Sequence, residues 1–162
     1  MSRRVIRMHV NGKPVEGEVE PRKLLVDFLR DDLGFTGTHV GCEHGICGAC
    51  TISMNGEAVR SCLLFAVQAD GTALATVEAV ADQPELHALQ NAFHQFHALQ
   101  CGFCTPGVLM SMAAFLAEQP NPSDAEIRVA LSGTLCRCTG YKNIVRAVGA
   151  AAQALADARG GQ

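Results

Sequence analysis

The sequence lacks several features that mark common functional classes. Its 13 Lys and Arg stand against 16 Asp and Glu, and this net charge of −3 gives no basis for nucleic-acid binding. It contains no G-x-G-x-x-G stretch and no glycine-rich phosphate loop, which argues against a dinucleotide or nucleotide site. The longest apolar run, residues 107–117, is too short to cross a bilayer, so we expect no membrane span.

The amino-terminal residues also lack the marks of an export signal. Residues 1–12 have no apolar core and no cleavage site, and a strand pattern begins directly after Arg3-Arg4, so we expect no twin-arginine signal. Eight cysteines are too few for a small disulfide scaffold, and their clustering indicates metal binding in a reducing compartment. We therefore expect a soluble, cytoplasmic protein.

The first half of the chain has the pattern of a small α+β domain. Residues 6–10 alternate apolar and polar side chains, and the Asn11-Gly12 pair predicts a hairpin that returns through residue 19. Leucine and phenylalanine at helical spacing predict a helix over residues 24–33. We expect a second hairpin over residues 50–62 and a last strand over residues 74–80, so that this domain ends near residue 81.

From Pro84 onward every periodic segment is helical. Apolar stripes predict two helices before a break at an Asn-Pro pair, and Ser123 with Glu126 forms a capping box that begins a third. A fourth helix follows up to about residue 155, and we expect residues 159–162 to be a frayed tail. Four amphipathic helices suit a small helical bundle.

Four cysteines in the first half, the first cysteine group, are spaced as in plant-type ferredoxins. Cys42, Cys47 and Cys50 form C-x4-C-x2-C, and Cys62 follows after eleven intervening residues. With that spacing four thiolates hold a 2Fe–2S cluster, and glycines in the loop bring backbone N–H groups close to the sulfurs. A four-cysteine zinc site is the alternative. Zinc sites prefer two paired C-x2-4-C knuckles, so we favour an iron–sulfur cluster.

The other four cysteines, the second cysteine group, lie in the helical half. Cys101 and Cys104 form C-x2-C between the first and second predicted helices, and Cys136 and Cys138 form C-x-C between the third and fourth. Both pairs lie in connections between helices, so one end of the bundle can bring all four together. On spacing alone this group fits zinc, a redox dithiol or a second cluster.

Three stretches, GCEHGICGACT, QCGFCTPG and LCRCTGY, occur in this order and, together with Cys62, contain all eight cysteines. In this combination the sequence resembles the iron–sulfur subunit of molybdenum hydroxylases, the xanthine dehydrogenase and carbon monoxide dehydrogenase family, over about residues 5–148. The resemblance implies an α+β chain with a β-grasp ferredoxin domain in residues 1–81 and a four-helix domain in residues 82–162. Each domain would hold one 2Fe–2S cluster.

The resemblance also implies roles for particular residues and for partner subunits. The first cysteine group would hold the cluster nearer the flavin, and the second group the cluster nearer the molybdenum. Gln100 would hydrogen-bond the molybdopterin, in its cytosine dinucleotide form, of a large subunit, and Cys138 would approach the same pterin. The remaining partner would be an FAD-binding medium subunit, in a dimer of heterotrimers.

The function implied is electron transfer between the molybdopterin site and FAD, with no substrate site on this chain. A free-standing two-cluster ferredoxin-type carrier and a structural zinc protein are the alternatives. Purification together with larger subunits would distinguish a subunit from a free-standing carrier. Visible absorption would distinguish an iron–sulfur protein from a zinc protein, because zinc sites are colourless. His44 lies inside the first cysteine loop and could suggest a Rieske site, but four cysteines already satisfy the ligand count, so we expect it to be a bystander. A zinc role is conceivable for His94 and His97, which are spaced i, i+3 on the first bundle helix, but we expect them to lie on its polar face. The substrate of the complex does not follow from these residues.

Overall fold

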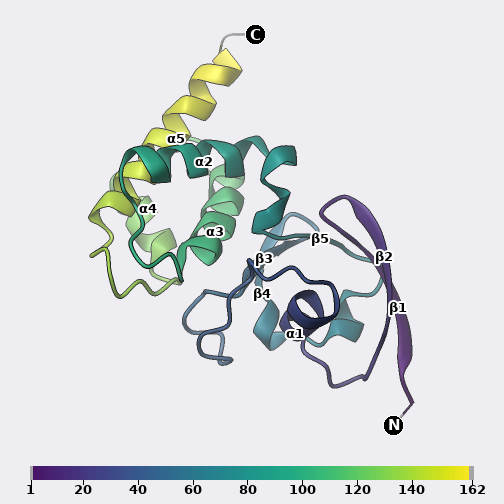
Figure 1. Cartoon of the computed structure of the whole chain (residues 1–162). Coiled ribbons are helices and arrows are strands. Elements are labelled where there is room, and N and C mark those ends of the chain that lie inside the picture. The colour runs from purple at the N-terminus through teal and green to yellow at the C-terminus, as the bar shows by residue number, and fades with distance from the viewer. Residues whose placement is uncertain (1, 161–162) are drawn as a thin grey trace.

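The computed structural model describes residues 2–160, except for the side chains of residues 80–82, and places them in two adjacent lobes (Figure 1). The first lobe is built on a five-stranded sheet with the order β2-β1-β5-β3-β4. Its strands are β1 (Arg4–Val10), β2 (Lys13–Val19), β3 (Thr51–Met54), β4 (Glu57–Arg60) and β5 (Ala73–Ala75). β5 runs parallel to β1 and antiparallel to β3, so it joins the two hairpins into one sheet.

Both hairpins turn where the sequence predicts. Asn11 and Gly12 have φ angles of 52° and 75°, and Asn55 and Gly56 have φ angles of 54° and 92°. Positive φ at both central positions is typical of a type I′ turn, which suits a two-residue hairpin and favours Asn-Gly. The alternation predicted for β1 is also confirmed. Its buried side chains are those of Ile6, Met8 and Val10.

The helix predicted over residues 24–33 is present, but it is not a regular α-helix. α1 (Leu25–Asp27) continues as one π-helical turn, Phe28–Asp32, which lies against the sheet (Figure 1). The ring of Phe28 is buried in the core of this lobe. Gly34, with a φ angle of 75°, follows the last turn as a glycine at a helix end does.

The strand predicted over residues 74–80 is wrong beyond Ala75. Thr76 leaves the sheet because its N–H donates to the side-chain oxygen of Asn11, at 2.8 Å, instead of continuing the strand ladder. The Asn11 amide in turn donates to the Thr76 hydroxyl at 3.0 Å. Short 3₁₀ turns then occupy Val77–Asp82 and lead into the second lobe.

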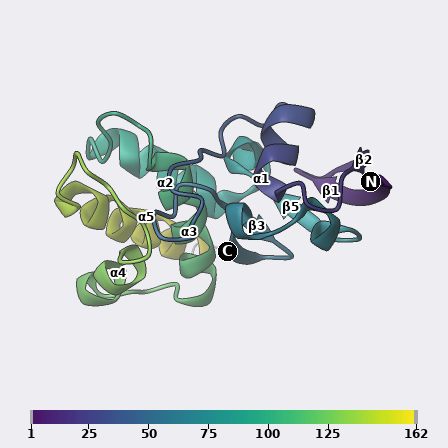
Figure 2. The same ribbon diagram turned by 90° about the horizontal axis from the view of Figure 1, so that it is seen from below.

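The second lobe contains the four predicted helices, α2 (Pro84–Gln95), α3 (Thr105–Glu118), α4 (Asp124–Leu131) and α5 (Lys142–Gly160). Each helix contributes apolar side chains to a shared core. Figure 2 shows that the helices themselves are gathered at one end of the molecule. Within residues 2–160, none of the helices has the length and apolar character needed to cross a membrane.

Two details of the helix ends test the sequence patterns. The capping box of α4 is confirmed, because the N–H of Glu126 donates to Ser123 Oγ at 3.3 Å and the N–H of Ser123 donates to the Glu126 carboxylate at 2.7 Å. The frayed tail is wrong for residues 159 and 160. α5 continues to Gly160, and Arg159 pairs with Glu85 of α2 at 3.1 Å. Residues 161 and 162 lie outside the described range.

The lobes meet where α3 packs on β3 and β4. A β-carbon at Gly107 of α3 would lie 2.2 Å from the carbonyl oxygen of Gly48, which belongs to the loop before β3. Only glycine fits at this position, so the backbone of α3 lies directly against the loop. The loop is the one that carries Cys42 and Cys47.

Candidate metal centres

The first cysteine group is spread over three parts of the first lobe. Cys42 and Cys47 lie in the loop after the π-helical turn, Cys50 directly precedes β3, and Cys62 lies in a short 3₁₀ turn after β4. Cys50 and Cys62 are 2% and 4% exposed and share a small buried cluster, whereas Cys42 and Cys47 are partly exposed. The β3–β4 hairpin therefore positions an inner pair of thiols, and the loop positions an outer pair.

Backbone N–H groups converge on the sulfur of Cys42. The N–H groups of His44 and Cys47 lie 3.3 Å and 3.4 Å from its Sγ. Glu43 and Gly45 have φ angles of 54° and 75°, which let the loop turn tightly enough for both contacts. These donors, Cys47 first, lower the pKa of Cys42 to about 6. The loop thus stabilises a thiolate, which is the form that binds metal.

Cys62, one of the inner pair, has the opposite acidity. Burial raises the pKa of Cys62 to about 11, and the neighbouring Cys50 thiol adds to this effect. Ser61 holds Cys50 in place, because its N–H and its hydroxyl donate to the Cys50 carbonyl oxygen at 3.3 Å and 2.7 Å. A cation bound here would reverse the preference for the neutral thiol and would release protons.

The second cysteine group brings together two loops of the helical lobe. Cys101 and Cys104 lie between α2 and α3, and Cys136 and Cys138 lie between α4 and α5. Sγ of Cys138 lies 3.4 Å from Sγ of Cys101, so the two loops meet at these sulfurs. Cys101 and Cys138 are exposed, and Cys104 and Cys136 are partly buried. The N–H of Phe103 lowers the pKa of Cys101.

The partly buried thiols of the second group differ in acidity. Burial, and then the contact with Cys136, raises the pKa of Cys104 to about 12. Burial acts most strongly on Cys136 as well, but several hydrogen bonds, first those from the hydroxyl and N–H of Thr139, together outweigh it and lower the pKa of Cys136. Thr139 Oγ1 lies 3.1 Å from Cys136 Sγ. One member of this pair is therefore prepared to ionise beside one that is not.

The thiols of the second group approach one another in pairs, Cys101 with Cys138 and Cys104 with Cys136. Across the described residues, no set of three or more His, Cys, Asp or Glu side chains is arranged around a point where one metal ion would bind. Each iron of a 2Fe–2S cluster takes two of the four protein ligands. Paired thiols with backbone N–H groups beside them fit that kind of cluster.

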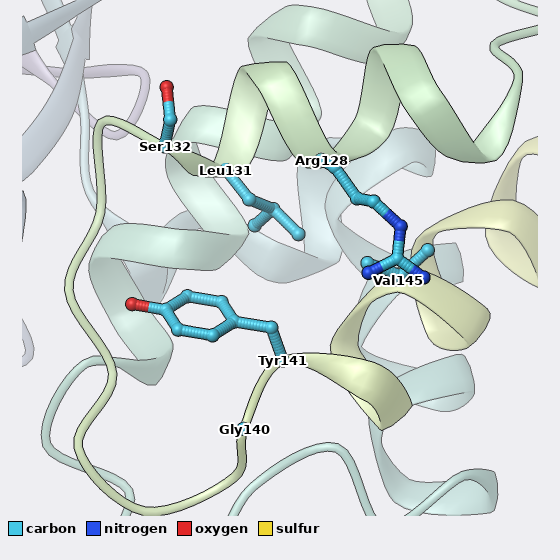
Figure 3. Close-up of a pocket in the computed structure, with 6 residues that line it drawn as sticks. All are labelled: Arg128, Leu131, Ser132, Gly140, Tyr141 and Val145. Carbon is cyan, nitrogen blue, oxygen red and sulfur yellow. The ribbon is translucent and has the colours of Figure 1, made fainter.

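Tyr141 holds the loop that carries Cys136. Its hydroxyl accepts the N–H of Cys136 at 2.7 Å and donates to the carbonyl oxygen of Thr134 at 3.1 Å. Tyr141 lines a pocket of about 300 Å³ together with Arg128 of α4 and Val145 of α5. Figure 3 shows these side chains. The sequence alone did not predict this role, although Tyr141 is the single tyrosine of the chain and ends the third cysteine motif.

Hydrogen bonds join the two cysteine loops across the interface between the lobes. The N–H of Leu135 donates to the carbonyl oxygen of Cys47 at 2.9 Å. Arg60, at the end of β4, donates from Nη2 to the carbonyl oxygen of Gly133 at 2.6 Å and from Nη1 to the hydroxyl of Thr51. The two cysteine groups therefore lie on either side of one interface.

A stacked pair forms another link between the lobes. The ring of His39 in the first lobe lies 5.0 Å from the ring of Phe103, centroid to centroid, with 22° between the planes. Nδ1 of His39 lies 2.7 Å from the Phe103 carbonyl oxygen. A carbonyl oxygen only accepts, so Nδ1 carries the proton in this contact. Since Phe103 stands between Cys101 and Cys104, His39 braces the second cysteine group from the first lobe.

The glutamine and the histidines singled out in the sequence also lie in the described part of the chain. Gln100 is exposed and directly precedes Cys101, so its amide is accessible beside the second group. His94 and His97 are exposed. His44 contributes its backbone N–H to Cys42, as described above.

Comparisons with known proteins place the two lobes in known families. Residues 8–76 match the model of the 2Fe-2S iron-sulfur cluster binding domain, and residues 76–149 match that of the 2Fe-2S binding domain. The caffeine dehydrogenase subunit gamma of Pseudomonas sp. (strain CBB1) is 58% identical over 151 residues, which cover 91% of this chain and 90% of that protein. The nicotine 6-hydroxylase small subunit of Paenarthrobacter nicotinovorans is 54% identical over 143 residues, 88% of this chain and 86% of that one. A chain of quinoline 2-oxidoreductase from Pseudomonas putida 86 has a TM-score of 0.91 at 49% identity, and the match covers 99% of both chains.

The fold and the two matched domains define a two-domain 2Fe–2S protein of α+β class. The chain belongs to the family of iron–sulfur small subunits of molybdenum hydroxylases, which includes the xanthine dehydrogenases. The family, the fold class and the role as an electron-transfer subunit of an oxidoreductase, all predicted from the sequence, are confirmed.

Proposed function

We propose that the first cysteine group holds one 2Fe–2S cluster and the second group another, with the ligands Cys42, Cys47, Cys50, Cys62 and Cys101, Cys104, Cys136, Cys138. The observation that carries the proposal is the meeting of loops far apart in sequence, where thiols pair and N–H groups converge on Cys42. When bound, such clusters take up and release single electrons. Around them, the chain holds the cysteines in place, supplies N–H donors and fixes the two loops relative to each other.

We also propose that residues 1–81 and 82–162 are separate domains, one for each cluster. Each lobe has its own apolar core. The short turns of Val77–Asp82 contain the proposed boundary. Because the two ligand sets share no residue, each domain should keep its own cluster when the other is damaged.

The partners that we propose are a molybdopterin-binding large subunit beside the second cysteine group and an FAD-binding medium subunit beside the first. Gln100 and Cys138 would face the pterin, in its cytosine dinucleotide form. Their exposure supports this role, as does the Gln100 amide, which has the donors and the acceptor that a pterin edge requires. A dimer of heterotrimers is the assembly that the family resemblance implies.

Exposed apolar side chains beside the cysteines favour a subunit over the alternative of a free-standing carrier. They occur in both lobes, and their exposed fractions are 67%, 57%, 48% and 54% for Ile46, Leu63, Phe103 and Leu135. Large apolar side chains around a functional site are typical of surfaces that a partner covers.

We propose that the complex acts on a nitrogen heterocycle, bound by a partner subunit. The support is that the relatives described above are named for caffeine, nicotine and quinoline, which are all nitrogen heterocycles. We place the complex in the cytoplasm. None of the eight cysteines, all of which lie in the described part of the chain, forms a disulfide, and thiolate ligands persist in a reducing compartment.

A reciprocal pair of variants tests the ligand sets. In the purified complex, Cys47→Ser should remove the EPR signal of one reduced cluster and leave the other, and Cys136→Ser should do the reverse. Each variant is the matched control for the other. If either variant removes both signals while the protein stays folded, the division of the ligands is wrong.

A second experiment tests the orientation toward the large subunit. Gln100→Ala should slow substrate-driven reduction of the clusters by up to about tenfold, because one lost hydrogen bond costs roughly 0.5–1.5 kcal/mol. Gln153→Ala is the control, because Gln153 is exposed on α5 and bonds Asp157 at 2.8 Å. Rapid mixing with unchanged iron content gives the rates. Equal rates in the two variants would show that Gln100 does not face the pterin.

A further inference from the structure

Arg60 lies between the two cysteine groups and forms a hydrogen bond to a residue close to each of them. It is partly buried at the end of β4, two residues before Cys62. Its Nη1 donates to the hydroxyl of Thr51, which directly follows Cys50, and its Nη2 donates to the carbonyl oxygen of Gly133 at 2.6 Å. Gly133 lies three residues before Cys136, so one guanidinium reaches both sides of the interface.

The acceptors that hold this guanidinium are neutral. Thr51 is itself held in place, because its hydroxyl donates to the Gly48 carbonyl oxygen at 2.6 Å. The ion pairs formed among the described side chains involve Arg7, Arg22, Lys23 and Arg159, and none of them involves Arg60. An arginine side chain stays protonated at any working pH. A full positive charge that these residues do not neutralise is therefore fixed beside both cysteine groups.

We propose that Arg60 raises the reduction potentials of both clusters through its charge. The inference rests on the ligand sets proposed above. One electron entering either site adds one negative charge there, and a nearby positive charge stabilises that state. Net charge around a cluster is one of the factors that set its potential. The fork of the guanidinium holds the charge in position, which a flexible side chain would not do as well.

The alternative is that Arg60 only fastens the two lobes together. The two roles make different predictions for two kinds of variant. Arg60→Lys keeps the charge but loses the two-armed contact, whereas Arg60→Gln and Arg60→Met lose the charge. A purely mechanical role would make all three variants alike in potential and different from the wild type in stability.

The test is an EPR-monitored redox titration of the purified complex, with dithionite as reductant and iron content measured on the same samples. Arg7→Gln is the control, because it removes the same charge from a side chain that is 73% exposed on β1. Iron content and the presence of two signals show first whether the ligand proposal holds. The titration then tests Arg60 separately.

We expect Arg60→Gln and Arg60→Met to shift the one-electron equilibrium of both sites about tenfold toward the oxidised form, a fall of about 59 mV in midpoint potential. Arg60→Lys and Arg7→Gln should stay within about twofold of the wild type. Unchanged potentials in a neutral variant that retains its iron would overturn the inference. So would an equal fall in Arg60→Lys. Loss of the clusters in both neutral variants alone would also overturn it, because Arg60 would then serve assembly.

Discussion

The backbone N–H of Leu135 donates to the carbonyl oxygen of Cys47 across the interface between the lobes, at 2.9 Å. Leu135 directly precedes Cys136, so this bond ties a member of the first cysteine group to the neighbour of a member of the second. The Arg60 contact with Gly133 lies in the same loop, two residues before Leu135. The relative position of the two groups is therefore set by main-chain geometry as well as by side-chain packing.

Replacing Leu135 tests this bond. Leu135→Pro removes the N–H and also fixes φ, so it should destabilise the protein by at least roughly 0.5–1.5 kcal/mol, the usual net value of one hydrogen bond. Leu135→Ala keeps the N–H and is the control, since the leucine side chain is 54% exposed and contributes little packing. Thermal unfolding of both variants gives the comparison. Equal midpoints for the two would mean that the bond does not hold the lobes.

The contact between α3 and the first cysteine loop makes Gly107 intolerant of a side chain. In Gly107→Ala the new β-carbon would lie 2.2 Å from the Gly48 carbonyl oxygen, so we expect about 1–3 kcal/mol of destabilisation and weaker iron retention. Gly149→Ala in α5 is the matched control. Its β-carbon would meet only Ile127, at 3.9 Å, so helix propensity should stabilise it by roughly 0.5–1 kcal/mol. Opposite signs in thermal unfolding are expected, and a harmless Gly107→Ala would refute the close contact.

Tyr141→Phe should weaken the second cysteine group in particular. The change removes two hydrogen bonds, each worth about 0.5–1.5 kcal/mol, and it leaves the partly buried N–H of Cys136 without a partner. We expect faster loss of the second cluster than of the first when a chelator is added. EPR during chelation measures both rates. Equal acceleration of the two losses would show that Tyr141 acts on the whole fold and not on this loop.

The acidity of the thiols predicts which cysteine reacts first in metal-free protein. The pKa of Cys42 is lowered to about 6, so above pH 6 most of it is thiolate, the nucleophilic form. The pKa of Cys62 is raised to about 11 and that of Cys104 to about 12, so both remain thiols up to pH 9. Iodoacetamide labelling between pH 5 and 9, followed by peptide mapping, should show Cys42 labelling level off above pH 7. Labelling of Cys104 as fast as Cys42 at pH 7 would contradict these assignments.

Local sequence signals predicted most of the fold. The two Asn-Gly turns, the alternation of β1 and the Ser123–Glu126 capping box depend on residues close together in the chain, and all are observed. The last strand is one exception. It ends early because the N–H of Thr76 donates to the side-chain oxygen of Asn11, 65 positions away. No local sequence pattern predicts this hydrogen bond.

The candidate site divides in the same way. Cysteine spacing is local, so both groups were predicted, and the structure brings Cys101 and Cys138 together as the helix connections suggest. The residues that join the groups were missed. Arg60 and Gly133 lie 73 positions apart, and His39 and Phe103 lie 64 apart, so their contacts arise only when the lobes pack. Their sequence context, an arginine and a histidine within three residues of a cysteine, is too common to be a signal.

We propose above all that this one chain holds two 2Fe–2S clusters on its eight cysteines. Iron and sulfide analysis, together with EPR of the dithionite-reduced chain, tests it most directly. We expect four irons and four inorganic sulfides per chain, since each of two clusters contains two of each, and two distinct EPR signals. Two irons with a single signal, or zinc in stoichiometric amount, would contradict it.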